Sequence, residues 1–104
     1  MSSAPRGNSL ASRDIASLVH PYTNLKAHQT NGPLVVGRGK GIYIYDDAGK
    51  EYIEGLAGLW CTSLGFDEPR LVEAATRQMK ALPTYHIFAG KSHEPGIELA
   101  ERLL

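Results

Sequence analysis

The block from Leu34 to Ile53, LVVGRGKGIYIYDDAGKEYI, constrains the fold more than any other part of the sequence. Its β-branched and aromatic residues alternate with polar ones, which is typical of strands. The segment Asp46–Lys50, DDAGK, separates two such runs, and Gly49 suits the left-handed position that follows a type I turn in short hairpins. The block therefore predicts an antiparallel meander of two or three strands.

Three glycines in this block, Gly37, Gly39 and Gly41, superficially resemble a nucleotide-binding loop. Their spacing does not match that motif, and a strand follows where a helix would have to begin. Kinked and twisted edge strands explain these glycines better than a phosphate site does.

A second distinctive stretch is Gly55–Phe66, GLAGLWCTSLGF, which contains the only tryptophan, Trp60, and the only cysteine, Cys61. Glycines let the backbone turn or approach a ligand, and tryptophan offers a flat apolar surface with one N–H donor. Two interpretations stay open. Composition favours a buried loop that closes a small core, and the alternative is the wall of a ligand site.

Residues 1–11 are expected to form a flexible tail. A helix is expected from Ser12, which would cap it, to Pro21, with Ile15, Leu18 and Val19 at helical spacing. The segment Asn24–Gly32 shows no period and is expected to be a loop.

A second helix is expected after Asp67, its cap, with Pro69 in the first turn and Pro83 beyond its end. Glu73 and Arg77, four residues apart on its polar side, can pair. An aromatic loop, Thr84–Gly90, follows, and a third helix is expected to begin near Ser92. The apolar face of this helix has no partner in the sequence; it consists of Ile97, Ala100, Leu103 and Leu104. The helical pattern still continues at Leu104, which suggests a cut chain.

Composition limits the function classes. A chain of 104 residues with formal net charge zero suits one small domain and offers no basic face for nucleic acid or anionic lipid. A single cysteine excludes an internal disulfide framework and fits a reducing compartment. There is no apolar run long enough for a membrane span or a secretory signal. We expect a cytoplasmic protein without membrane or nucleic-acid partners.

Candidate catalytic groups are incomplete. His86 and His93 are close in sequence but lack further ligands for a metal, so no metal site is expected. Cys61 is far in sequence from any histidine, and no pair of carboxylates suggests an acid and a base. A lysine that forms a Schiff base must be desolvated or lie beside another cation. The lysines here lie in expected turns or on polar faces of expected elements: Lys26, Lys40, Lys50, Lys80 and Lys91. The residues alone indicate a small α+β unit without a self-sufficient active site.

Three stretches carry a family resemblance: HPYT at His20–Thr23, the run Val35–Phe66, and the helix and aromatic loop that continue to Phe88. In order and spacing they resemble the N-terminal segment of class III pyridoxal-phosphate aminotransferases, closest to the omega-amino-acid:pyruvate transaminases. The resemblance covers residues 12–104. It implies an α+β fold with an N-terminal helix, an antiparallel β-meander and two further helices, matching the N-terminal part of the small domain of fold-type I enzymes.

The resemblance also implies a function. The parent enzyme would be a homodimer that uses pyridoxal 5'-phosphate to move an amino group from an amine or omega-amino acid to a keto acid such as pyruvate. This segment would act as lid, substrate wall and dimer contact. Five residues match positions that contact substrate in the family: Tyr22, Leu59, Trp60, Tyr85 and Phe88. His86 receives no role.

The family's phosphate loop, its aspartate for the pyridine nitrogen and its aldimine lysine have no counterpart here, so this chain alone is expected to be inactive and no catalytic residue is assigned. The rival hypothesis is a short non-catalytic interaction domain that keeps the family's dimer-contact surface. A third is a thiol or metal enzyme that uses Cys61 and His86.

Overall fold

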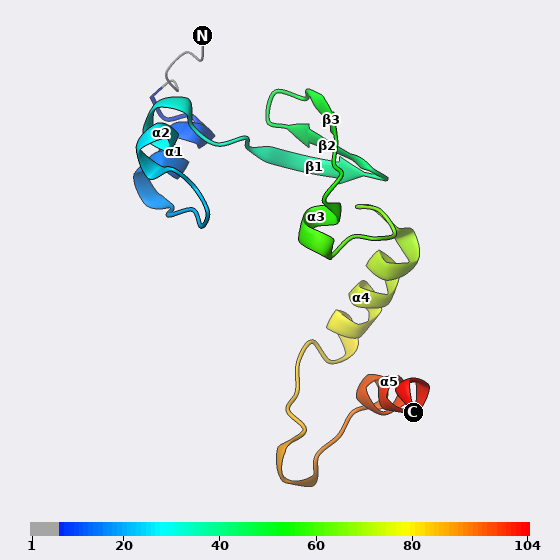
Figure 1. Ribbon diagram of the computed structural model, residues 1–104. Helices are drawn as coiled ribbons and strands as arrows, with labels where there is room; N and C mark the ends of the chain where they lie inside the picture. The colour runs from blue at the N-terminus through cyan, green and yellow to red at the C-terminus, as the bar shows by residue number, and fades with distance from the viewer. Residues whose placement is uncertain (1–6) are drawn as a thin grey trace. The chain divides into compact units, whose positions relative to one another are not determined.

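The computed structural model describes residues 7–104 (Figure 1). They form two compact units, one ending at Asp67 and one beginning at Glu68, and each is described by itself. The first unit contains α1 (Leu10–Ser17), α2 (Leu25–Asn31), β1 (Val36–Lys40), β2 (Tyr43–Asp46), β3 (Glu51–Ile53) and α3 (Ala57–Trp60). The second contains α4 (Pro69–Ala81), a 3₁₀ turn η1 (Phe88–Gly90) and α5 (Glu94–Leu103).

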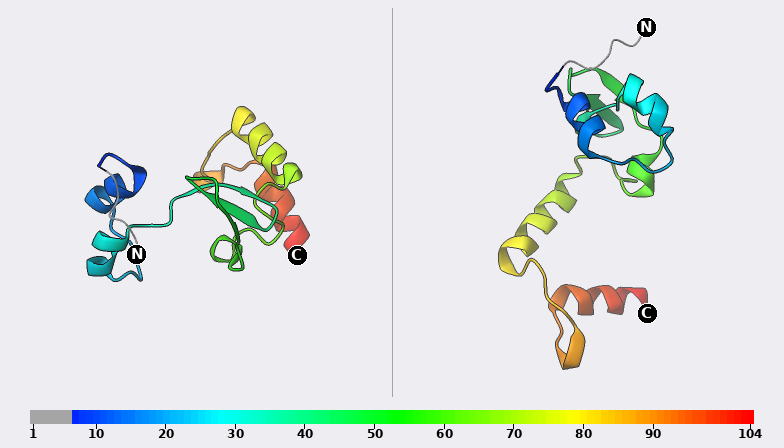
Figure 2. Two further views of the ribbon diagram at one scale, coloured as in Figure 1. Left: turned by 90° about the horizontal axis from the view of Figure 1, so that it is seen from above. Right: turned by 90° about the vertical axis from the view of Figure 1, so that its left-hand side faces the viewer.

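The three strands form one antiparallel sheet in the order β1-β2-β3, which Figure 2 shows from two further directions. This confirms the predicted meander. A register shift between Val36 and Arg38 marks a bulge in β1, in agreement with the expected kinked strand. Across the β1–β2 pair, the Arg38 guanidinium carbon lies 3.4 Å from the centre of the Tyr45 ring.

The turn between β2 and β3 is held by Asp46. One carboxylate oxygen of Asp46 accepts hydrogen bonds from the backbone N–H groups of Ala48 (3.0 Å) and Lys50 (2.8 Å), and Gly49 has a φ of 84° as predicted. The backbone hydrogen bond from Lys50 is the main cause that lowers the pKa of Asp46. The Tyr52 hydroxyl, which also donates to this carboxylate, adds to the effect and together they outweigh the opposing effect of burial.

The expectations for the first helices need three corrections. The first concerns the end of α1, which lies at Ser17 rather than next to Pro21, because Leu18 is already extended with φ −119° and ψ 129°. Residues 1–6 of the expected tail lie outside the described residues, but α1 already begins at Leu10, and its cap is Ser9, whose hydroxyl accepts the Ser12 N–H at 3.1 Å. The segment expected to be a loop contains α2, a short polar helix. Asn24 caps its first turn by accepting the Ala27 N–H, and Gly32, with a φ of 70°, ends it.

In the second unit, α4 has Pro69 at its start as predicted, but its cap is Glu68, which accepts the Arg70 N–H. Asp67, the expected cap, instead accepts the backbone N–H of Gly41 at 2.8 Å. The expected Glu73–Arg77 pair is present at 3.2 Å. The N-cap of α5 is His93, whose ring nitrogen Nδ1 accepts the Gly96 N–H.

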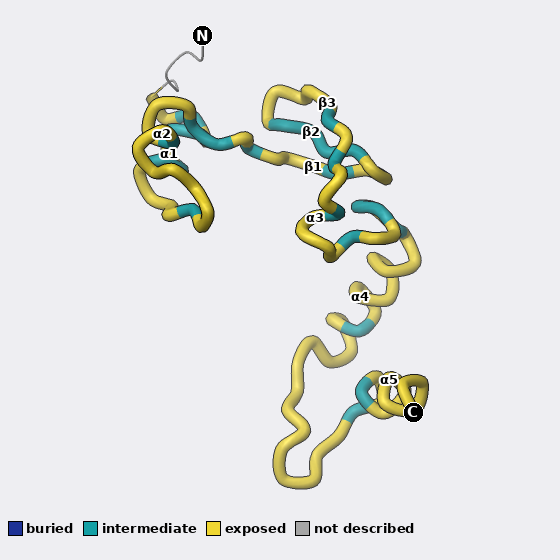
Figure 3. The backbone as a smooth tube through the Cα atoms, viewed as in Figure 1, coloured by how far each residue is buried: buried dark blue, intermediate teal, exposed yellow. Residues whose placement is uncertain are grey.

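No residue among 7–104 is buried, as the yellow and teal tube in Figure 3 shows. The interpretation of Gly55–Phe66 as a buried loop is therefore wrong for this chain. Large apolar side chains are exposed on α4 and α5, among them Met79 (67%) and Leu103 (77%). None of the helices in the described part combines the length and apolar character that a bilayer crossing requires.

Candidate functional site

The segment 55–66, here called the tryptophan loop, is closed at both ends by the turn between β1 and β2. Before the loop, the backbone N–H of Glu54 donates to the Ile42 carbonyl at 2.9 Å. After it, the N–H of Phe66 donates to the Gly41 carbonyl at 3.0 Å. A surface loop whose ends meet in this way is an Ω-type loop, a form that is frequently functional.

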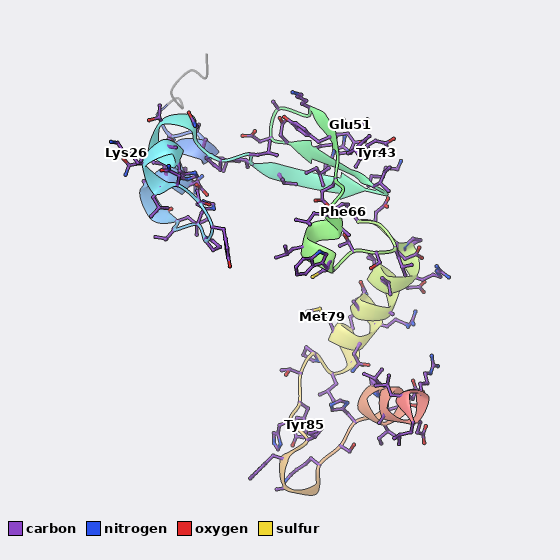
Figure 4. All side chains as sticks on the ribbon, viewed as in Figure 1. Lys26, Tyr43, Glu51, Phe66, Met79 and Tyr85 are labelled. Carbon is purple, nitrogen blue, oxygen red and sulfur yellow. The ribbon has the colours of Figure 1, made fainter. Side chains whose placement is uncertain are left out.

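Phe66 also ties the loop to the sheet (Figure 4). A methyl group added at Gly39 of β1 would lie 2.6 Å from the Phe66 Cβ, so the aromatic residue sits directly against the glycine. On the other side, a methyl group added at Gly58 of α3 would lie 3.5 Å from the Phe66 ring. Phe66 therefore fills the space between β1 and α3, and its close approach to β1 requires glycine at position 39.

The short helix α3 is a left-handed turn. Its four residues, Ala57, Gly58, Leu59 and Trp60, have φ values of 51°, 59°, 63° and 69°. The ψ values of Gly58 and Leu59, 38° and 54°, complete left-handed helical geometry. The turn closes with backbone hydrogen bonds from Trp60 N–H to the Leu56 carbonyl (2.9 Å) and from Cys61 N–H to the Ala57 carbonyl (2.8 Å).

A left-handed conformation is unfavourable for residues with a side chain, by about 1–2 kcal/mol each. Only one of the four residues of α3 is glycine, so the turn is strained. Three further non-glycine residues among those described have positive φ: Asn8 (64°), Tyr22 (48°), itself a candidate, and Ala89 (54°), which follows the candidate Phe88. Strained backbone persists where surrounding contacts impose it, and such residues cluster at ligand sites.

The strained turn exposes the two candidate side chains it carries. Leu59 is 60% exposed and Trp60 is 79% exposed. Glu54, which precedes the loop, accepts hydrogen bonds from two backbone N–H groups of this turn through its two carboxylate oxygens. The sequence analysis assigned no role to Glu54, because its contacts follow from the backbone conformation of α3.

The aromatic loop of the second unit carries Tyr85 and Phe88. The rings of Tyr85 and His86 stack with centroids 4.6 Å apart, and Nδ1 of His86 accepts the backbone N–H of Phe88 at 3.2 Å. Tyr85 is half exposed and Phe88 is 79% exposed. His86 thus organises the loop, a role that the sequence did not reveal.

The five predicted substrate-binding residues therefore occur in three groups. Leu59 and Trp60 share one turn, Tyr85 and Phe88 share one loop, and Tyr22 lies on the connection between α1 and α2 with its side chain fully exposed. Their contact with a substrate stays a prediction.

A cluster that the sequence analysis missed joins α1 to α2. Oδ1 of Asp14 lies 2.9 Å from Nε2 of His20 and 2.9 Å from Nε2 of His28, and the ligand atoms of all three residues lie within 4.8 Å of one another. Three such groups can hold a divalent metal ion. The carboxylate is also fully engaged without one, because each imidazole hydrogen-bonds to it.

Burial acts to raise the pKa of Asp14, but hydrogen bonds and positive charge from His20 and His28 outweigh it, and the net shift lowers the pKa. The sequence shows Asp14, His20 and His28 only as separate polar residues. Because Asn24–Gly32 was expected to be a loop, nothing indicated that α2 would bring His28 next to Asp14.

A family model described as class-III aminotransferase matches residues 24–104. The chain therefore belongs to the class-III aminotransferase family, which confirms the resemblance noted in the sequence.

Among curated relatives, the chain is 54% identical over 72 residues to gamma-aminobutyrate transaminase 1, mitochondrial, of rice (Oryza sativa subsp. japonica), a match that covers 69% of this chain and 14% of the relative. Among solved structures, it matches the omega transaminase from Pseudomonas jessenii in complex with PMP, with 57% identity and a TM-score of 0.87. That match covers 91% of this chain and 21% of the solved chain. The fold is thus that of the N-terminal part of a transaminase.

A further match, also with a TM-score of 0.87, is a thermostable omega transaminase variant with substitutions of a tryptophan, a phenylalanine and an arginine, engineered for asymmetric synthesis of enantiopure bulky amines. It is 56% identical, and the match covers 91% of this chain and 21% of that one. The chain spans about a fifth or less of the length of the relatives it matches.

Proposed function

We propose that this chain is the N-terminal segment of a pyridoxal-phosphate-dependent transaminase that moves an amino group from an amine or omega-amino acid to a keto acid such as pyruvate. Membership in the class-III family and the likeness to omega transaminases over 91% of the chain support this proposal. Within the complete enzyme the segment acts as lid, substrate wall and dimer contact.

The observation that carries the proposal is the strained left-handed turn α3, which exposes Leu59 and Trp60 on a loop closed at both ends. A sequence that keeps an unfavourable backbone at two large apolar side chains uses them for a contact outside the segment. We assign Leu59 and Trp60 to the wall of the amine-binding pocket.

The engineered variant adds support. Its substituted tryptophan and phenylalanine are as many residues apart in that protein as Trp60 and Phe88 are here. Those substitutions were made for bulky amines. We therefore propose that Trp60 and Phe88 limit the size of the amine substituent that the pocket accepts. Tyr22 and Tyr85 complete the proposed set of substrate contacts.

The cofactor is not anchored by this segment. Pyridoxal phosphate acts as an electron sink and is held through a reactive lysine, which must be desolvated or beside another cation. All five lysines of the chain are exposed: Lys26, Lys40, Lys50, Lys80 and Lys91. The residues present therefore do not fit the cofactor's anchor, and the chain alone is proposed to be inactive.

The exposed apolar faces of α4 and α5 favour contacts with other parts of the complete enzyme. We propose that the rest of the enzyme and a second subunit cover them, because faces of this kind are unfavourable in water. We propose the cytoplasm as the compartment, since the single cysteine, Cys61, is a free thiol. A fluorescent fusion of the full-length protein would test this location.

The test of the function uses the full-length protein that contains this segment, incubated with pyridoxal phosphate, an amine donor and pyruvate. We expect alanine to form in proportion to the amine consumed. Native mass spectrometry of the same sample should show two full-length subunits with cofactor. A sample in which the chain occurs alone, near 11.3 kDa, without cofactor and without alanine formation, would contradict the proposal and favour the non-catalytic interaction domain.

A further inference from the structure

Glu54 connects the sheet to the strained turn. Its backbone N–H is bound to the Ile42 carbonyl, which fixes the main chain beside β2. Its side chain reaches forward along the chain: Oε1 accepts the Leu56 N–H at 3.1 Å, and Oε2 accepts the Gly58 N–H at 2.9 Å. Each carboxylate oxygen therefore holds one backbone donor at the start of α3.

These two donors have a special need for an acceptor. The first N–H groups of any helical turn have no partner within it, and the residue before α3, Leu56, has no side chain that could cap them. An ionised carboxylate makes stronger hydrogen bonds than a neutral acceptor. Glu54 thus supplies the cap from two residues upstream and favours a backbone conformation that Ala57, Leu59 and Trp60 would otherwise avoid.

We propose that Glu54 is the positioning residue for Trp60: by holding the left-handed turn, its carboxylate fixes where the indole lies and so sets the selectivity between bulky and small amine donors. This inference rests on the proposed function. Glu54 itself touches neither substrate nor cofactor in this role. It acts through the backbone of α3.

The first test is Glu54→Gln in the full-length enzyme. Glutamine has nearly the same shape but only one acceptor oxygen, so one N–H of the turn would face the amide NH₂ instead of an acceptor. We expect the ratio of kcat/KM for a bulky amine to that for a small amine to change by about fivefold or more, since hydrogen bonds to charged groups are the stronger ones. The melting temperature should change little.

The matched control is Glu51→Gln, the same chemical change three residues earlier. Glu51 lies on β3 and accepts the Tyr45 hydroxyl, away from the tryptophan loop. Its variant should keep the wild-type selectivity ratio. A change as large as that of Glu54→Gln would mean that loss of either carboxylate charge alters selectivity, and it would overturn the inference.

A double-mutant cycle with Trp60→Gly separates positioning from a general structural role. If Glu54 acts through the indole, Glu54→Gln should leave the selectivity ratio unchanged in the Trp60→Gly background. An equal change in both backgrounds, or no change in either while the protein remains folded, would overturn the inference. If Glu54→Gln fails to fold, Glu54→Asp takes its place, because it keeps both oxygens but shortens the reach.

The outcome is distinguishable from failure of the proposed function. An inactive wild-type enzyme would disprove the function, whereas an active enzyme with unchanged selectivity in Glu54→Gln would disprove only the positioning role. Crystal structures of the wild type and of Glu54→Gln test whether the carboxylate holds the left-handed turn, and they need no enzyme assay. Positive φ values retained at all four residues of α3 in the variant would show that the carboxylate is not what holds the turn.

Discussion

Gly39→Ala should disrupt the packing that supports the tryptophan loop. The added methyl group would lie 2.6 Å from Cβ and 2.7 Å from Cγ of Phe66. Because carbon atoms pack best at about 3.5–4.0 Å, Phe66 would have to move by roughly 1 Å. A change of rotamer cannot relieve the contact, since the Phe66 Cβ is attached to the main chain, whose N–H is bound to the Gly41 carbonyl.

The magnitude follows from these contacts. Overpacking of this kind costs about 1–3 kcal/mol. Stretching the Phe66–Gly41 hydrogen bond adds about 0.5–1.5 kcal/mol. We therefore expect the melting temperature of the full-length protein to fall by several degrees, measured by thermal unfolding with saturating cofactor. Because Phe66 also contacts α3, selectivity between amines should change as well.

The control for this variant is Gly37→Ala, two residues earlier on β1. A methyl group there would meet its nearest atom, the Asp46 carbonyl oxygen, at an ordinary 3.7 Å, and Gly37 does not have positive φ. Its melting temperature should equal or slightly exceed that of the wild type, since alanine also restricts the unfolded chain. Equal melting temperatures for the two variants would refute the reasoning, and so would full rescue of Gly39→Ala by Phe66→Leu, which leaves Cβ in place.

Three further predictions concern single groups of the described chain. The pKa of Asp14 is lowered in the folded protein, so its ionised form stabilises the fold above the pKa of the unfolded chain, near 3.8. This contribution is lost as pH falls through the lower pKa of the folded state. Asp14→Asn should therefore remove that part of the acid dependence, measured by thermal unfolding at pH 2–6. The Thr62 hydroxyl has no hydrogen-bond partner although it is buried, so Thr62→Val should leave the melting temperature unchanged or raise it, and a clear decrease would indicate an unseen partner. His86→Ala should free the Phe88 backbone and raise KM for the amine more than it lowers kcat, in steady-state kinetics.

Local sequence signals predicted the elements whose causes are local. The alternating block Leu34–Ile53 became the three-stranded meander, Gly49 took the left-handed turn position, and Pro69 opened α4. In each case the residues that specify the conformation are neighbours in sequence. The α+β class followed from the same signals.

The missed features depend on contacts that sequence neighbours do not make. The polar helix α2 lacks an apolar stripe, so its only signals were Asn24 and Gly32 at its ends. Asp67 was the more obvious cap for α4, yet it binds Gly41, far away in sequence, and leaves the cap to Glu68. Aspartate is a preferred cap residue and glutamate is not, so cap preference pointed to Asp67, whose carboxylate the tertiary structure uses elsewhere.

The left-handed turn shows why the candidate site is the hardest part to read. Alanine, leucine and tryptophan have no intrinsic preference for positive φ, so the amino-acid sequence of α3 does not predict its left-handed conformation. The causes lie on both sides: the Glu54 carboxylate at the start, and the attachment of the loop ends to Gly41 and Ile42. These contacts impose a conformation that local propensity opposes. This disagreement between local propensity and backbone at Trp60 supports the proposed substrate contact, because strained residues persist where surrounding contacts impose them and cluster at functional sites.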